Sequence, residues 1–425
     1  MANRRGMVWR VLAAAAVLLA GLVGPAASGG PVTITFWHGM SGVLQPAVNE
    51  LTEDFNKLNP GIVVQALYQG NYGVLNQKLI ASVAAGNPPT ISQVFPTWTD
   101  QLIRAHAIVP MERFIKGPDG LTDEQLADIL PILRQANTFG SVMWTMPFNK
   151  SLYLLFYNVD LFKELNVKVP QTWDEFVAAA RALTKEEGGR VVRYGFVVRP
   201  VTDYFTTMML ADGGAFTKPG GREVAFNGPA GVEALQWLAD LVNKHKVAYV
   251  KPGFADDDFG AGKVAMYFAT NPGLAFAKAA VGGKFTVGLA PLPYKTTRST
   301  LLSGTDVAIM ARATPEQQAA AWKYIRFITG TTGTTRWSLK TFYMPVRRSA
   351  LDSTLMRVYL RDNPEHKAGL DSLEFARTEP SMAEWQEIRD IIQEAVELAV
   401  LGKATPQQAL DQAAAKANRL LAQRK

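Results

Sequence analysis

Cysteine is absent from this chain of 425 residues, and histidine occurs only four times. Without cysteine there is no disulfide framework, no thiolate metal site and no cysteine nucleophile. The four histidines stand singly along the sequence, with no H-x-x-x-H pair, which argues against a zinc hydrolase. The absences therefore favour neither a disulfide-rich scaffold nor a histidine-based metalloenzyme.

Charge is sparse as well, because only 19% of the residues are charged and 44 Lys plus Arg face 37 Asp plus Glu. A net charge of +7 indicates nucleic-acid binding only where the positively charged residues cluster on one face of the protein. We expect no nucleic-acid partner. Hydrophobic residues make up 48% of the chain, including 9 Trp, 21 Phe and 12 Tyr, which is typical of a folded protein. A chain of this length is expected to form two or more domains.

The N-terminal segment carries part of the positive charge. Arg4, Arg5 and Arg10 precede an apolar run over residues 11–23, and small residues follow up to Ser28. This pattern predicts a secretory signal peptide, residues 1–28, that is cleaved after Ser28. A membrane anchor is the weaker alternative, since a run this short rises only about 20 Å as a helix, whereas a hydrocarbon core is about 30 Å thick. No cysteine follows, so we expect a periplasmic or other extracytoplasmic protein that is not a lipoprotein.

Strand-like and helix-like segments alternate after this region. The apolar spacing predicts strands over 32–37, 62–68, 90–95, 152–157, 264–269, 285–289 and 306–311, and helices over 44–58, 74–84, 160–165, 172–185, 229–245, 314–329, 382–401 and 405–422. Thr172 with Glu175 forms a capping box. The opening β-α-β-α-β order predicts an α/β fold whose sheet binds ligands beyond the carboxyl ends of its strands. No repeat or low-complexity linker is found, so two lobes packed together are expected.

The sequence matches known catalytic and phosphate-binding motifs poorly. Residues 39–42 lack the G-x-S-x-G spacing of a nucleophile elbow, and residues 260–263 lack the upstream Gly and the following Ser or Thr of a phosphate-binding loop. Residues 256–258, three aspartates, lack the Gly and Glu of a calcium loop and fit a solvated helix start better. We therefore predict no enzyme, no catalytic residue, no metal site and no cofactor.

Arg389 is more informative than the total charge. In the helix predicted near the C-terminus it lies beside the apolar stripe, one turn after Trp385 and one turn before Ile392, with no acidic residue three or four positions away. A buried guanidinium needs a partner, and its fork suits phosphate or carboxylate. An ion pair with a distant Asp or Glu remains the alternative. Aromatic side chains also cluster where strands or helices end, at Trp37, Tyr72, Trp98 and Tyr343, which suits a small polyol or phosphate ligand, although core packing explains any single one of them.

Several motifs together resemble the extracellular solute-binding proteins of ABC importers. The general marks are FNKLNP at 55–60, AAGNPP at 84–89, FYNVDLF at 156–162, PQTWDEF at 170–176 and FGAGKVAM at 259–266. FWHGMSG at 36–42, GNY at 70–72, QVF at 93–95, PFN at 147–149, FYMP at 342–345 and GKATPQQAL at 402–410 are similar to the subfamily that binds glycerol-3-phosphate. The resemblance covers essentially the whole chain after the signal region.

The resemblance implies a periplasmic-binding-protein fold, in which two lobes, each a mixed sheet flanked by helices, hinge and close over a ligand. It implies lobes of residues 31–147 plus 270–330 and of residues 148–269 plus 331–425, a membrane permease as partner and a monomeric state. Arg389 is expected to neutralise the ligand phosphate, and Tyr72, Trp37 or Trp98 to cover the polyol. The remaining expected contacts are Ser151, Thr270, Asn271, Gly304 and Tyr343.

Two positions depart from the subfamily pattern. Pro96 stands where the subfamily has a glutamate, and the aromatic wall of the second lobe has no clear counterpart in residues 199–204. Loss of a bulky wall leaves room for a group esterified to the phosphate, so a glycerophosphodiester rivals glycerol-3-phosphate as the expected ligand. A neutral sugar or oligosaccharide remains an alternative within the same fold, and a secreted phosphodiester hydrolase is the alternative from another class.

Overall fold

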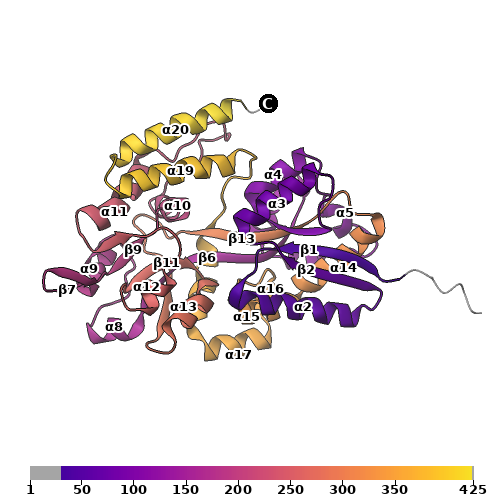
Figure 1. Cartoon of the computed structure of the whole chain (residues 1–425), viewed down its shortest axis with the longest axis horizontal. Helices are drawn as coiled ribbons and strands as arrows, with labels where there is room; N and C mark the ends of the chain where they lie inside the picture. Colours follow the sequence, from indigo (N-terminus) through magenta and orange to yellow (C-terminus); the bar gives the residue numbers. More distant parts are fainter. Residues whose placement is uncertain (1–29, 424–425) are drawn as a thin grey trace, which may run out of the picture.

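A mixed eight-stranded sheet extends through both halves of the protein, in the order β11-β6-β13-β3-β1-β2, with β12 paired to β6 and β14 paired to β13. The computed structural model describes residues 30–423, so the predicted signal peptide lies outside the described residues. Helices cover the sheet and form two lobes (Figure 1). The α/β, two-lobed fold class predicted from the sequence is confirmed.

The first lobe contains the strands β1 (Val32–His38), β2 (Ile62–Tyr68), β3 (Ile91–Val94), β4 (Thr138–Phe139) and β5 (Val142–Met143). Its helices are α2 (Gln45–Leu58), α3 (Tyr72–Ala84), α4 (Pro96–Arg104), α5 (Glu112–Ile115), α6 (Asp123–Ala127), α7 (Pro131–Ala136), α14 (Pro315–Thr329), α15 (Thr331–Thr341), α16 (Arg348–Leu351), α17 (Thr354–Asp362) and α18 (Lys367–Asp371).

The second lobe contains β7 (Lys185–Glu187), β8 (Arg190–Arg193), β9 (Phe196–Val198), β10 (Ala248–Val250), β11 (Met266–Thr270) and β12 (Val287–Ala290). Its helices are α8 (Val159–Glu164), α9 (Trp173–Leu183), α10 (Thr202–Ala211), α11 (Pro229–Asn243), α12 (Asp256–Gly260), α13 (Gly273–Val281), α19 (Trp385–Val400) and α20 (Pro406–Ala422). The strands β6 (Met146–Asn158), β13 (Thr300–Ile309) and β14 (Ala376–Arg377) lie at the junction of the lobes.

The core of the first lobe forms because alternate residues of β1 and β3 face the apolar stripes of α2 and α14. Phe36 is fully buried and packs edge-on against Phe148 and Tyr324, while Phe55 of α2 contacts the same tyrosine ring. β1 pairs in parallel with β2 and β3, so their carboxyl ends meet at one edge of the sheet. That edge faces the second lobe, as the β-α-β-α-β pattern predicts.

The core of the second lobe gathers α9, α10, α11, α19 and α20 around the far half of β6. α9 begins with the predicted capping box, in which Thr172 Oγ1 accepts from the backbone N–H of Glu175. Trp385, Ile388 and Ile392 form the buried stripe of α19, as their spacing predicts. α19 and α20 lie together at the top of this lobe, and α19 contacts α4 of the first lobe (Figure 1).

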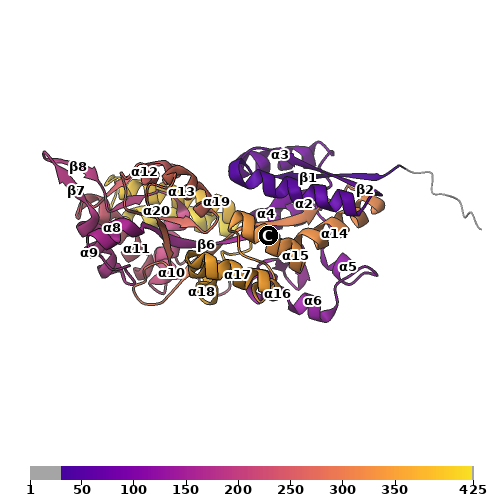
Figure 2. The ribbon, with the colours of Figure 1, turned by 90° about the horizontal axis from the view of Figure 1, so that it is seen from below.

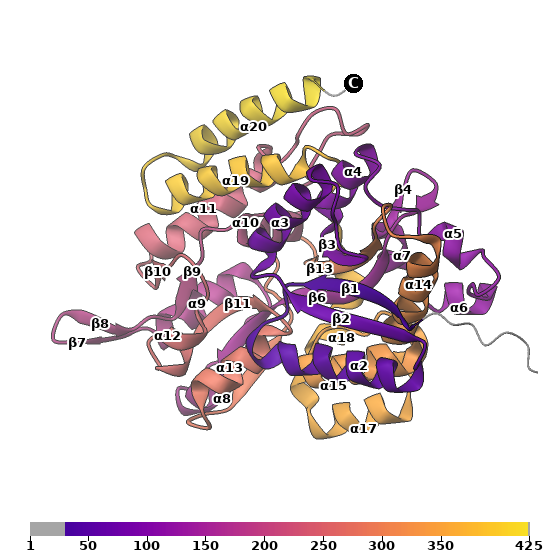
Figure 3. The same ribbon diagram turned by 45° about the vertical axis from the view of Figure 1, so that its right-hand side comes forward.

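The chain passes between the lobes along two long strands and one extended segment. β6 pairs with β13 through its first half and with β11 and β12 through its second half, so a single strand belongs to both lobes. β13 returns antiparallel to it and pairs with β3. The third passage runs between Ala376, in the core of the first lobe, and Met382, in the core of the second. Viewed from below, and after a turn of 45° about the vertical axis, β6 lies between the two groups of helices (Figures 2 and 3).

The packing differs from the predicted lobe boundaries in two segments. α13 packs with Phe156 and Phe259 in a core cluster on the second-lobe side, although residues 270–330 were expected in the first lobe. Trp337 and Val346 pack into the core of the first lobe, although residues 331–425 were expected in the second. We therefore propose a first lobe of roughly residues 31–150 and 303–376, with the remainder forming the second. No described helix has both the length and the apolar character needed to cross a bilayer.

Candidate functional site

Two neighbouring cavities lie between the lobes, and both take residues from each. The first, of about 400 Å³, lies between α3 and α4 on one side and α19 on the other. The second, of about 300 Å³, lies between the loop after β1 and the segments that follow β9 and β11. We call the first the Arg389 cavity and the second the Arg199 cavity, after the one arginine that lines each.

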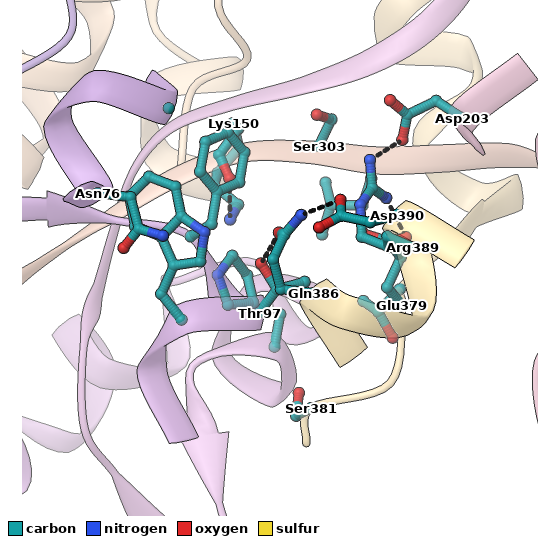
Figure 4. Close-up of a pocket in the computed structure, with 18 of the residues that line it drawn as sticks. Asn76, Thr97, Lys150, Asp203, Ser303, Glu379, Ser381, Gln386, Arg389 and Asp390 are labelled. Atoms are coloured by element: carbon teal, nitrogen blue, oxygen red, sulfur yellow. Dashed lines mark hydrogen bonds and ion pairs between the residues drawn. The ribbon is translucent and has the colours of Figure 1, made fainter. Parts of the chain in front are cut away.

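The Arg389 cavity is polar. The passage between the lobes contributes Thr378, Glu379 and Ser381, and α19 contributes Gln386, Arg389 and Asp390. Opposite them lie residues of α3, α4 and the strand junction: Gly73, Asn76, Gln77, Phe95, Pro96, Thr97, Trp98, Lys150, Ser303 and Gly304. Figure 4 shows Arg389 between Asp203 and Glu379, with Gln386 linking Thr97 to Asp390.

Arg389 forms ion pairs with both Asp203 and Glu379. Its Nη2 lies 3.0 Å from Asp203 Oδ1, and its Nη1 contacts Glu379 Oε1. The helical phase therefore placed the arginine correctly on an inner face, and the distant carboxylates considered as the alternative are its partners in the structure. A phosphate contact at Arg389 stays a prediction, and such a ligand has to displace or outcompete two carboxylates.

The ion pairs set the protonation of this cluster. Burial disfavours the charged form of Arg389, but the two carboxylates outweigh burial and raise the pKa of the guanidinium above its ordinary value. Burial raises the pKa of Glu379, and Arg389 opposes that rise only in part. Arg389 stays charged, while Glu379 is easier to protonate than a carboxyl in water. With Asp390 nearby, the cavity offers three carboxyl groups to one guanidinium.

Hydrogen bonds already join the lobes at the far end of this cavity. Thr97 Oγ1 donates to Gln386 Oε1 at 3.2 Å, and the backbone N–H of Ala383 donates to Asp100 Oδ2 at 2.8 Å. α4 begins with Pro96, whose fixed φ suits the first position of a helix. The departure from the subfamily glutamate at this position therefore has a local structural role as well.

The Arg199 cavity is largely apolar and ringed by hydroxyl groups. Met40, Ser41 and Leu44 line it from the first lobe, and Phe254, Phe276 and Pro272 line it from the second. Tyr72, at the start of α3, Tyr343, just after α15, and Thr270, the last residue of β11, add hydroxyls. Arg199 follows β9, and Asp256 opens α12.

Two tyrosines separate the cavities. Tyr72 lines the Arg199 cavity and is followed by Gly73, which lines the Arg389 cavity. Tyr153 lines the Arg199 cavity, but its hydroxyl donates to Asp203 Oδ2 at 3.0 Å on the other side. Burial raises the pKa of both phenols well above the ordinary value, so both stay protonated and can donate.

The strand junction beneath the cavities holds a third cation. Lys150 Nζ lies 3.0 Å from Asp306 Oδ1, and the side chains are only 1% and 0% exposed. Gly304 lies beside this pair with a φ of 95°, and an added Cβ there would collide with the carbonyl oxygen of Asn149. Glycine is therefore required where β13 crosses β6. Burial raises the pKa of Asp306, and Lys150 opposes that rise.

Six of the nine predicted ligand-binding residues line one of the two cavities, and three line neither. Trp98, Gly304 and Arg389 line the Arg389 cavity, and Tyr72, Thr270 and Tyr343 line the Arg199 cavity. Three others line neither. Ser151 is buried in β6 opposite Ser303, Trp37 lies within β1, and Asn271 is occupied by hydrogen bonds with the backbone N–H of Leu152 and the carbonyl oxygen of Phe342. Ligand contacts by these three stay predictions.

Sequence reasoning missed several residues of the cavities, among them Asp203, Glu379, Arg199 and Phe254. Asp203 and Arg199 belong to the 199–204 segment, whose sequence indicates only a missing aromatic wall. The aspartates at 256–258 were expected to be solvated. Asp257 is, but Asp256 lines the Arg199 cavity and accepts from the hydroxyl of Tyr267 at 2.9 Å. Within residues 30–423, no group of three or more His, Asp and Glu side chains is placed to hold a metal ion.

Comparison with known proteins identifies a family and its relatives. A family model described as a bacterial extracellular solute-binding protein matches residues 50–368. The sn-glycerol-3-phosphate-binding periplasmic protein UgpB of Salmonella typhimurium is 27% identical over 413 residues, covering 92% of each chain. UgpB of Escherichia coli K12 is 27% identical over 410 residues, again covering 92% of each.

Two solved structures share the fold. UgpB of Mycobacterium tuberculosis in complex with glycerophosphocholine has a TM-score of 0.83 and 24% identity, covering 93% of this chain and 99% of that one. The GacH receptor of Streptomyces glaucescens, solved unliganded and with acarbose, has a TM-score of 0.82 and 21% identity, covering 93% and 100%. At these identities the structural likeness establishes the fold alone.

Proposed function

The chain belongs to the bacterial extracellular solute-binding protein family, and we propose that its ligand is a glycerophosphodiester or glycerol-3-phosphate held in the cleft between the lobes. Members of this family bind small molecules and deliver them to an ABC permease in the membrane. The chain is thus the substrate-binding component of an importer, as its motifs indicate. The resemblance noted in the sequence is confirmed at the level of the family.

The observation that carries the ligand proposal is the pair of adjoining cavities, each with one arginine. Their volumes, about 400 and 300 Å³, each fall within the range of small-molecule sites. A phosphodiester carries two substituents on one phosphate, so it can place a group in each cavity across the tyrosine partition. A monoester fills one cavity only, which is why we favour the diester.

The relatives support this ligand class. The curated relatives are described as binding sn-glycerol-3-phosphate, and the M. tuberculosis structure holds glycerophosphocholine. Periplasmic relatives also support export of this chain, and we propose cleavage of residues 1–28 and a monomeric, non-lipidated mature protein. The family is one of binding proteins rather than enzymes, and the absence of catalysis stays a prediction.

A neutral sugar is the second candidate, and one observation favours it. Arg389 is already neutralised by Asp203 and Glu379, and carboxylates of this kind can accept hydrogen bonds from sugar hydroxyls while Trp98 offers a ring to stack on. GacH, which shares the fold, binds acarbose. The two candidates differ in whether the ligand carries a negative charge.

Calorimetric titration and thermal melting of the full mature chain test the proposal. The probes are glycerol-3-phosphate, glycerophosphocholine and maltose, with free glycerol as the uncharged control. We expect glycerophosphocholine to bind most tightly and, at about 100 times its Kd, to stabilise the protein by roughly 2.7 kcal/mol. Tighter binding of maltose than of either phosphate compound contradicts the proposal and supports the sugar alternative.

A further inference from the structure

The Arg389 cavity is lined by more acidic than basic side chains. The charged residues among the described ones that line it are Lys150, Asp203, Glu379, Arg389 and Asp390. The charge of Lys150 is matched by that of Asp306, which lies beneath the cavity and 3.0 Å from Lys150 Nζ. Three carboxyl groups and one guanidinium therefore dominate the electrostatic potential that a ligand meets there.

Two of the carboxylates are fixed beside the guanidinium. Asp203 accepts from Arg389 Nη2 through Oδ1 and from the hydroxyl of Tyr153 through Oδ2, both at 3.0 Å, while Glu379 accepts from Arg389 Nη1. The side chains of Arg389, Asp203 and Glu379 are 19%, 19% and 15% exposed, so water screens their charges less than on an open surface. Figure 4 shows Asp390 on the same side of the cavity.

This arrangement leaves Arg389 able to bind a phosphate. A guanidinium has five N–H groups, and the two ion pairs use one on each Nη atom. A phosphate can therefore share the guanidinium with the carboxylates or displace one of them. In both cases Asp203 and Glu379 stay in the walls of the cavity, so a phosphate bound at Arg389 lies close to negative charge.

The charge of the phosphate then decides how strongly it is repelled. The second proton of a phosphate monoester dissociates with a pKa of about 6, so glycerol-3-phosphate is mostly a dianion near neutral pH. A phosphodiester has no second proton to lose and carries one negative charge. Each carboxylate repels the dianion about twice as strongly at the same distance. Arg389 attracts the dianion more strongly too, but the three carboxyl groups outnumber it.

Protonation of Glu379 relieves this repulsion only at a cost. Burial raises the pKa of its carboxyl, and a second anion beside it favours the protonated form further. Near neutral pH that proton has to be taken from a dilute supply in solvent. A dianion meets either a charged Glu379 or one that has been protonated at this cost, and both weaken its binding relative to that of a monoanion.

We propose that Asp203, Glu379 and Asp390 are specificity-determining residues that select a singly charged phosphodiester against a doubly charged phosphate monoester. The selection acts on the charge of the phosphate and does not require a cationic group on the second alcohol. It adds a criterion of charge to the criterion of size that the two adjoining cavities supply. The inference rests on the proposed function and on the predicted contact between the phosphate and Arg389.

Calorimetric titration of the full mature chain with three probes tests the selection. Glycerol-3-phosphate is the monoester, glycerophosphocholine is a diester with a cation, and glycerophosphoglycerol is a diester without one. Wild-type protein should bind both diesters at least about fivefold more tightly than the monoester. E379Q keeps the shape of the side chain and removes its charge, so it should narrow the preference for glycerophosphoglycerol over glycerol-3-phosphate at least about threefold.

Two further variants make the comparison specific. E387Q is the matched control, because Glu387 is an exposed residue of α19 that lines neither cavity, and its preference should equal that of wild type. D390N removes the charge of an exposed side chain that lines the cavity, so it should fold normally and narrow the preference in the same direction as E379Q. If E379Q does not melt cooperatively, D390N decides alone.

Each outcome supports or overturns the inference. A narrowed preference in E379Q or D390N, with E387Q like wild type, supports it. An unchanged preference in both variants overturns it while the proposed function stands, and so does wild-type protein that binds glycerophosphoglycerol no more tightly than glycerol-3-phosphate. Wild-type protein that binds none of the three probes overturns the proposed function, and this inference with it.

Discussion

The two arginines of the cleft have opposite surroundings. Arg389 is held by Asp203 and Glu379 on a rigid helix packed into the core of the second lobe, whereas Arg199 follows a strand and lies between aromatic rings with a buried Nε that has no partner. A guanidinium with two carboxylates is a structural group first, and a ligand must compete with those partners. Arg199 instead has one carboxyl group in its cavity, that of Asp256, which also accepts a hydrogen bond from Tyr267.

Lys150 extends the comparison to a fully buried cation and should give the largest effect. K150M leaves Asp306 alone in the strand junction, and we expect the free energy of unfolding to fall by about 3–5 kcal/mol. The double variant K150M/D306N removes both charges and should recover much of that loss. Urea denaturation of the three proteins measures it. A loss below about 1 kcal/mol in K150M would show that the pair is more hydrated than its burial indicates.

Substitution of either arginine should lower the free energy of unfolding by less than K150M does, and by different amounts at the two positions. R389M leaves Asp203 and Glu379 facing each other without a cation, so we expect a loss of about 2–4 kcal/mol. R199M removes stacking on Phe254 and Tyr204 and a partly exposed attraction to Asp256, for a smaller expected loss of about 1 kcal/mol. Thermal and urea unfolding without ligand make the measurement. Equal losses in the two variants would contradict this comparison of their surroundings.

The smallest expected effect is on the pH dependence of stability, to which Glu379 should make a measurable contribution. Because burial raises the pKa of this carboxyl in the folded protein, the folded state binds more protons than the unfolded state just above the ordinary glutamate pKa. Stability therefore falls as the pH rises through that window, and E379Q should remove this part of the slope.

His38 gives a slope of the opposite sign in the same profile. Burial lowers the pKa of its imidazole to about 4, so its contribution to stability is lost as the pH falls from the ordinary histidine value towards 4. The comparison is therefore made on the difference between E379Q and wild type at each pH, in which the histidine contribution cancels. A pH-independent difference would contradict the role assigned to Glu379.

The secondary structure could be predicted because its signals are local. β2 has the bounds expected from its apolar alternation, and the capping box at Thr172 begins α9 as expected. The helical phase of α19 also placed Arg389 on an inner face. Its partners could not be found in this way, since Asp203 lies 186 residues away in sequence and is brought near only by the packing of α10 on α19.

The lobe boundaries that we propose depart from the predicted ones for a similar reason. β6 continues through Asn149, Lys150 and Ser151, three polar residues that look like a break in a strand pattern but are buried within the sheet. The ion pair of Lys150 and the strand pairing of all three come from β13, more than 150 residues later, and Asn149 also bonds to Gln93 and Tyr72, so no local pattern could indicate that they belong to a strand. The Arg199 cavity was missed because an arginine without a motif carries no sequence signal.

The two strands shared by the lobes also constrain how the chain folds. In the finished sheet β3 pairs with β13, for example Ile91 with Ile309, so the sheet of the first lobe lacks a strand until more than 200 further residues have been made. The whole second lobe except its last two helices lies between these partners in sequence. We therefore expect slow folding governed by late, long-range strand pairing, with the exposed edge of β3 as the region that most needs protection from aggregation meanwhile.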